Sequence, residues 1–164
     1  MTKYLLDTNV FIQAKNLHYG FDFCPAFWHW LQEQNRTGKV ASIEKVGDEL
    51  SREDELASWA RDQGKDFFLP ADEIVIPELT SVSQWASTQN YEPAAISIFS
   101  QGADYWLIAH AKAHGYTVVT HEIPANSIKK IKIPNVCIGL KLHCINPYEM
   151  LRREHARFVL GATK

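Results

Sequence analysis

Four carboxylates stand at positions where they could meet and hold a metal ion. Asp7 ends the first apolar run of the chain, and Glu49 lies in a helical stretch after the second. Asp104 falls in the first turn of an expected helix, and Glu122 follows a run rich in β-branched residues. Converging carboxylates repel one another, and a divalent cation such as Mg²⁺ or Mn²⁺ removes that penalty. Two such ions roughly 3.5–4 Å apart support in-line displacement at a phosphodiester.

Short polar residues accompany these acids. Thr8 and Asn9 directly follow the first acid, and Thr120 lies two residues before the fourth. Side chains of this size can orient a metal ligand or a water molecule, although a turn or cap role is the alternative for Asn9. His121 adjoins the fourth acid and could contact a substrate phosphate.

A basic segment ends the chain. Residues 128–164 hold eight Lys and Arg and only two Glu, while the whole chain has a net charge of −2. This asymmetry favours an anionic partner for the basic end. Lys129, Lys130 and Lys132 follow the fourth acid closely enough to hold phosphates beside it. The alternative is that these lysines are only the solvated neighbours of buried isoleucines.

The elements that must position these residues follow from apolar periodicity. Buried strands are expected at Lys3–Asp7, Lys39–Ile43, Tyr116–Thr120 and Asn135–Leu140, and Phe67–Pro70 reads as a linker or short strand. Helical spacing predicts a helix from Val10 to Leu17, and Pro25 stands well as the first residue of a helix through Ala26–Gln34. Another helix is expected after the second strand, as far as Leu50. Further helices are expected at Asp54–Gln63, at Pro77–Thr88, at Ala103–His114, and from Pro147 to about Phe158. Pro93 could open one more short helix.

Strands that alternate with helices predict an α/β fold with a central, mainly parallel sheet and helices on both faces. The ligand site of such a sheet lies outside the carboxyl ends of its strands, where all four acids are expected. The length of 164 residues favours a single domain over residues 1–164, with the basic segment inside it.

Composition excludes several classes of protein. A hydrophobic fraction of 46% argues against intrinsic disorder, and no run of eighteen apolar residues predicts a membrane-spanning helix. The start of the chain carries no pattern of a secretory signal, and three cysteines without a C-x-x-C pair suggest no disulfide framework. We therefore expect a cytoplasmic protein with no membrane partner. Nucleophile-elbow, Walker A and dinucleotide-binding motifs are absent from the sequence.

Two histidines suggest a competing zinc site. His110 and His114 are four residues apart on one expected helix, which is a spacing that can bind zinc. No Glu follows His110, so the sequence lacks the H-E-x-x-H pattern, and both residues fall on the apolar stripe. Core histidines are therefore the preferred interpretation.

The acidic motifs resemble those of the PIN-domain nucleases, in order, over residues 3–140. Tyr4–Ile12 is similar to the family's opening strand followed by Asp-Thr-Asn, and Ser42–Leu50 to its second motif. Gly102–Ala109 resembles the Asp that opens an Ala-rich helix, and Val118–Glu122 the strand that ends in Thr and an acid. The family usually has Asp where this chain has Glu122. The segment 129–137 resembles a bacterial and archaeal branch of PIN-like proteins.

The resemblance implies a Mg²⁺- or Mn²⁺-dependent ribonuclease, and for prokaryotic members often the toxin of a type II toxin–antitoxin pair. It implies that Asp7, Glu49, Asp104 and Glu122 hold the metal, with Asp104 or Asp7 orienting the attacking water. RNA would be the substrate, and a protein antitoxin and a second copy in a homodimer would be partners. The alternative is a catalytically inactive PIN-like module that binds RNA or protein, which the Glu at position 122 keeps open.

Overall fold

Two apolar runs near the start of the chain form the centre of a parallel sheet. In the computed structural model, which describes residues 3–161, β1 (Tyr4–Leu6) and β2 (Val40–Ile43) are buried along their whole length. A strand buried on both faces reads as a continuous apolar run rather than an alternating one. The other strands are β3 (Phe68–Leu69), β4 (Thr117–Val119) and β5 (Cys144–Ile145). All pair in parallel in the order β3-β2-β1-β4-β5.

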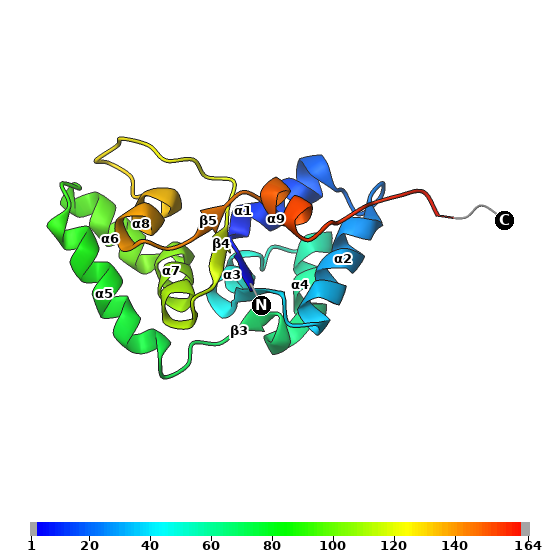
Figure 1. Ribbon diagram of the computed structural model, residues 1–164, viewed down its shortest axis with the longest axis horizontal. Helices are drawn as coiled ribbons and strands as arrows, with labels where there is room; N and C mark the ends of the chain where they lie inside the picture. Colours follow the sequence, from blue (N-terminus) through cyan, green and yellow to red (C-terminus); the bar gives the residue numbers. More distant parts are fainter. Residues whose placement is uncertain (1–2, 162–164) are drawn as a thin grey trace.

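Helices cover both faces of this sheet. The helices are α1 (Thr8–Gln13), α2 (Pro25–Arg36), α3 (Glu44–Glu49), α4 (Glu55–Gln63), α5 (Val75–Thr88), α6 (Pro93–Gln101), α7 (Ala103–His114), α8 (Ile133–Leu140) and α9 (Pro147–Arg153). A π-helical turn, η1 (Ala14–His18), follows α1, and a 3₁₀ turn, η2 (Gly64–Asp66), follows α4. Helices α5 to α8 lie on one side of the strands, and α1, α2, α4 and α9 lie on the other (Figure 1). The predicted α/β architecture is confirmed.

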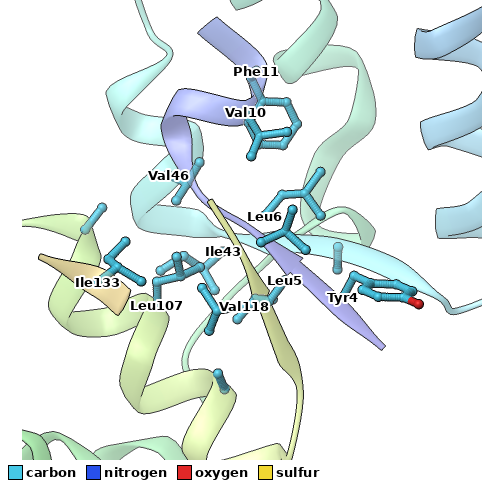
Figure 2. Packing of buried hydrophobic residues seen from close by; sticks show 14 of the residues in the cluster. Tyr4, Leu5, Leu6, Val10, Phe11, Ile43, Val46, Leu107, Val118 and Ile133 are labelled. Atoms are coloured by element: carbon cyan, nitrogen blue, oxygen red, sulfur yellow. The ribbon is translucent and has the colours of Figure 1, made fainter. Parts of the chain in front are cut away.

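The core fills the space between the sheet and these helices. Leu5 and Val118 are adjacent partners on β1 and β4, and neither is accessible to solvent. Leu107 of α7 and Ile133 of α8 pack in the same cluster, as Figure 2 shows. Burying each such side chain contributes about 1.5–3 kcal/mol, so the sheet and the α7–α8 layer stabilise each other.

The strand order places a topological switch beside β1. The chain moves outward from β1 to β2 and β3, then returns through α5, α6 and α7 to β4 on the other side of β1. The carboxyl ends of β1 and β4 therefore border the crevice where parallel sheets usually bind ligands. The segments that follow these two strands begin with Asp7 and Thr120.

The strand predicted at Asn135–Leu140 is wrong, because this segment belongs to α8. Pro134 stands in the first turn of α8 after an extended Lys132, and Lys141 ends the helix in the left-handed conformation. A short apolar run bounded in this way fits a buried helix as well as a strand, and periodicity alone does not separate the two. The fifth strand lies later in the chain, at Cys144–Ile145.

Other boundaries differ less. The short strand at Phe68–Leu69 and the helix that begins at Pro93 are both present. The last helix ends at Arg153 rather than near Phe158, because His155 adopts a positive φ of 53°. The ring of Phe158 instead packs edge-on against Tyr19, which anchors the extended end of the described chain. No helix among residues 3–161 is long and apolar enough to cross a membrane.

Gly139 gives a test of the α5–α8 packing. A methyl group at this position would overlap the indole of Trp85 on α5. We expect Gly139→Ala to lower the free energy of unfolding by about 1–3 kcal/mol, because overpacking forces the ring or α8 to move. Urea unfolding measures the change, and Gly161→Ala, where the added methyl meets open space, is the control. Equal stabilities of the two variants would contradict this packing.

His110 gives a test based on pH. Its side chain is only 3% exposed, and burial lowers its pKa to about 4. The unfolded chain binds this proton near pH 6.5, so the stabilisation is fully present above that pH and is lost as the pH falls towards 4. The loss is up to about 3 kcal/mol. The titratable or charged residues around the ring are Lys3, Glu44, Lys45, Asp72, His114 and Tyr116.

The variant His110→Phe isolates this contribution, because it keeps a ring and leaves those neighbours in place. Its free energy of unfolding should fall less steeply between pH 6.5 and 4 than that of the unmodified chain. Urea titrations at several pH values measure both slopes. Parallel slopes would show that His110 binds its proton as readily in the folded protein as in the unfolded chain.

Candidate functional site

Asp7 is the buried centre of the acidic edge. It ends β1 and caps α1, and its side chain is held by two donors. The Thr8 amide donates to Oδ1 at 2.7 Å, and the Thr120 hydroxyl donates to Oδ2 at 2.8 Å. Burial raises the pKa of Asp7 to about 6, and the charges of Glu122 and Glu49 add to this effect. The fold thus places a carboxylate where its negative charge is costly.

Asp104 faces Asp7 from the first turn of α7. Its carboxylate accepts no hydrogen bond from the residues that the structure describes. Burial raises its pKa to about 7, and the charges of Asp7, Glu122 and Glu49 raise it further. Lys130 acts in the opposite direction. The four predicted acids are therefore close enough to repel one another.

Glu49 and Glu122 each accept one hydrogen bond, through one of the two carboxylate oxygens. The Thr8 hydroxyl donates to Oε2 of Glu49 at 2.6 Å, and the Ile133 amide donates to Oε2 of Glu122 at 2.8 Å. The second bond ties Glu122 to the first residue of α8. In both residues the structure shows Oε1 without a hydrogen bond from residues 3–161, so this oxygen can still bind another group.

The polar residues predicted beside the acids join these elements into one network. Asn9 donates through Nδ2 to the Thr120 hydroxyl at 3.1 Å and accepts the His121 amide through Oδ1 at 3.0 Å. The Glu122 amide also donates to the Thr120 hydroxyl. Thr120 therefore fixes the end of β4 to α1 as well as to Asp7.

The acids open onto two neighbouring cavities. One, of about 270 Å³, is lined by Asp7, Thr8, Asn9, Asp104 and Glu122 among others. The second, of about 260 Å³, is lined by Glu49, Asp104, Lys129 and Lys130 among others. Asp104 borders both. Lys132, which was also predicted to hold substrate, lines neither cavity and precedes α8 as its cap.

The donor set suits a hard divalent cation in part. All four side chains offer carboxylate oxygens, and Asp104 combines partial burial with the absence of any hydrogen-bond donor among the described residues. Within residues 3–161, however, no three His, Cys, Asp or Glu side chains are already grouped as a metal site. To hold one Mg²⁺ or Mn²⁺ ion in common, the four carboxylates would therefore have to move closer together.

The predicted zinc alternative gains nothing from the structure. His114 contacts Asp72 at 2.8 Å, and the His110 and His114 rings stack with their centroids 5.2 Å apart. Among the described residues, no further side chain completes a set of three metal ligands with these histidines. The interpretation of core histidines therefore fits their surroundings better.

Two residues beside the acids were not predicted. His18 and Tyr148 lie against His121, with His121 ring centroids 5.5 and 5.8 Å away respectively. Burial and the neighbouring His18 lower the pKa of His121. Nothing local in the sequence marks these two residues, because they lie 130 positions apart. The π-helical turn that ends at His18 is a structural signal, since such turns are frequent at functional sites.

Comparison with solved structures places this fold beside two known chains. A chain of the crystal structure of FitAcB from Neisseria gonorrhoeae has a TM-score of 0.51 and 20% identity, covering 88% of this chain and 98% of its own. A chain of the structure of FitAB bound to the IR36 DNA fragment has a TM-score of 0.52 and 21% identity, covering 88% and 95%. At this level of identity the likeness concerns the fold.

Sequence comparison gives the family. No curated protein sequence matches the chain. A family model described as a domain of unknown function (DUF4411) matches residues 4–158, which include the whole acidic edge and the helices around it. The chain belongs to the DUF4411 family.

Proposed function

We propose that this protein is a Mg²⁺- or Mn²⁺-dependent endoribonuclease with a PIN-like fold. One observation carries the proposal: carboxylates from four separate parts of the chain lie near the switch point of the sheet, and burial together with their mutual repulsion raises the pKa of Asp7 and Asp104. Such a cluster of carboxylates destabilises a protein unless a bound cation offsets their repulsion. The PIN-like motifs and the fold shared with the FitAB chains support the same activity.

The residues of the chain divide the work of phosphodiester hydrolysis. When bound, Mg²⁺ or Mn²⁺ would supply Lewis-acid stabilisation of the phosphate oxygens and would lower the pKa of a water molecule. Asp7, Glu49, Asp104 and Glu122 would hold this cation. Asp104, which has no donor among the described residues, would also orient the attacking water. Thr120 holds the Asp7 carboxylate in place for its role.

The basic side chains beside the acids would hold the RNA backbone. Lys129 and Lys130 border the cavity that also contains Asp104 and Glu49. Their charges offset the repulsion between the acids and the phosphates that flank the reacting one, without reading the sequence. His121, which lies on the opposite side of the acids from these lysines, would also contact the RNA strand.

The biological role we propose is that of the toxin in a type II toxin–antitoxin pair, with a protein antitoxin as partner and a homodimer as the assembly. The PIN-like motifs imply this role. A chain of FitAB, whose structure was solved with a bound DNA fragment, shares the fold. A second candidate is an inactive module that binds RNA or protein. The bond between Glu122 and the Ile133 amide favours it, because that oxygen is already used.

Metal dependence gives the first test of this function. We expect a single-stranded RNA to be cut with millimolar Mn²⁺, and EDTA to abolish the cleavage. Asp104→Asn should lower the cleavage rate by orders of magnitude, while its melting temperature without metal stays equal or rises because one repelling charge is gone. Mn²⁺ should raise the melting temperature of the unmodified chain more than that of the variant.

The matched control is Asp48→Asn, which removes an exposed carboxylate next to Glu49 on the same helix and should leave cleavage unchanged. Gel electrophoresis of labelled RNA measures the rates, and thermal melts measure the stabilities. RNA that stays intact with Mn²⁺, yet binds to the chain, would support the inactive module instead.

The lysines give the next test. Lys129→Gln combined with Lys130→Gln should weaken RNA binding for all sequences alike and make log Kd less dependent on log salt, by roughly 0.7 per lost phosphate contact. Cleavage at saturating RNA should change little. Lys132→Gln is the control, because this residue lies outside both cavities and should keep the salt dependence unchanged. Equal slopes in all three proteins would assign these lysines to the solvated surface.

A further inference from the structure

Three rings from distant parts of the chain meet beside the acidic edge. His121 follows β4, Tyr148 lies in the first turn of α9, and His18 ends the turn η1. The Tyr148 hydroxyl and Nε2 of His18 are 3.0 Å apart, and the rings of these two residues meet edge-on with centroids 5.6 Å apart. Each ring therefore keeps a polar atom at its tip while its faces remain apolar.

This aromatic cluster (His18, His121 and Tyr148) is fixed to the acidic centre. The His121 amide donates to Asn9, and Asn9 in turn donates to the Thr120 hydroxyl that holds Asp7. Its position relative to Asp7 therefore follows from main-chain and buried side-chain hydrogen bonds. A ligand that contacts the cluster lies at a defined place relative to the reacting phosphate.

A cavity of about 390 Å³ opens next to the cluster. Its walls include the side chains of His121, Ile123, Pro134, Ile138, Asn146 and Tyr148. Glu122 lines both this cavity and the acidic one, so the two are neighbours. A cavity of this size, with both apolar and polar side chains in its walls, is large enough for a flat organic ring.

The charges of the residues that line this cavity indicate which kind of ligand it can bind. Glu122 and Glu149 border the cavity, and no Lys or Arg is among the described residues that line it. A phosphate group would be repelled there, whereas a flat, uncharged ring would gain stacking and apolar contact. The ring nitrogens of His121 and Nδ2 of Asn146 could then bind the edge of that ring, because the Tyr148 hydroxyl already contacts His18.

We propose that this cavity receives one unpaired nucleobase of the RNA strand whose phosphate lies at the acidic centre. The inference rests on the proposed ribonuclease function and narrows its substrate to single-stranded or looped RNA. Bases that are free of pairing stack on Tyr and His side chains, whereas a base inside a duplex cannot leave its neighbours without an energetic cost.

The first experiment needs no change in the cavity. The Asp104→Asn chain, which should leave RNA uncut, is mixed with a short single-stranded RNA that carries 2-aminopurine at successive positions. We expect fluorescence quenching at one position, and an abasic nucleotide there should weaken binding about five- to a hundredfold. The same sequence in a duplex should bind less tightly, and its fluorescence should not change when the protein is added.

Variants then locate the stacked base. In the Asp104→Asn chain, Tyr148→Ala should weaken binding by a similar factor and remove the quenching, while Tyr148→Phe should keep most of both because its ring still stacks. His121→Ala should act like Tyr148→Ala. The matched control is Phe23→Ala, which removes an aromatic ring that is 66% exposed and lines none of the three cavities.

The outcomes separate this inference from the proposed function. Abasic nucleotides without effect at every position, with Tyr148→Ala equal to the control, would overturn the base site even if the unmodified chain cuts RNA. Stacking in the cavity without Mn²⁺-dependent cleavage would overturn the ribonuclease and keep the base site. If Tyr148→Ala weakens binding of a protein partner and leaves RNA binding unchanged, the cavity is a protein interface and the inference is wrong.

Discussion

The burial of the Asp7 carboxylate at the end of the central strand is the constraint on which the site depends. A buried charge is costly unless donors or an opposite charge compensate it. Two neutral donors do so in part, the Thr8 amide and the Thr120 hydroxyl. Because Thr120 follows β4, the environment of Asp7 exists only while β1 and β4 pair in the register Leu6 to Val119. Formation of the sheet and formation of the site are therefore the same event.

Asp104 shows the other side of this constraint. It is brought towards Asp7 by α7, which packs extensively on α5 and contacts β4. The hydrophobic burial of α7 thus offsets the cost of holding Asp104 near Asp7, whose charge raises the pKa of Asp104. Sites that keep such unfavourable charge together are common where function, rather than stability, determines the residues.

Helix α8 connects the acidic edge to the core and to the aromatic cavity. Its first amide binds Glu122, its buried face packs on α5 and α7, and Pro134 and Ile138 line the cavity beside His121. Glu122 thereby stands between the two cavities. A group bound in either cavity would contact the same carboxylate. One extended ligand could therefore occupy both cavities.

Local apolar periodicity and capping were enough to predict the α/β class, most helices, and the places of Asp7 after the first strand and Asp104 in the first turn of α7. The sequence also put Glu49 in the helix after the second strand, where it is the last residue of α3, and Glu122 after β4. It could not determine whether Asn135–Leu140 is a strand or a helix, since a short apolar run fits both and packing on α5 and α7 decides. Nor could it show that His18 and Tyr148 meet His121, or that Lys132 stays outside the cavities of its neighbours. Those relations depend on how strands far apart in the chain pair and on how helices pack against them, which no local pattern of residues contains.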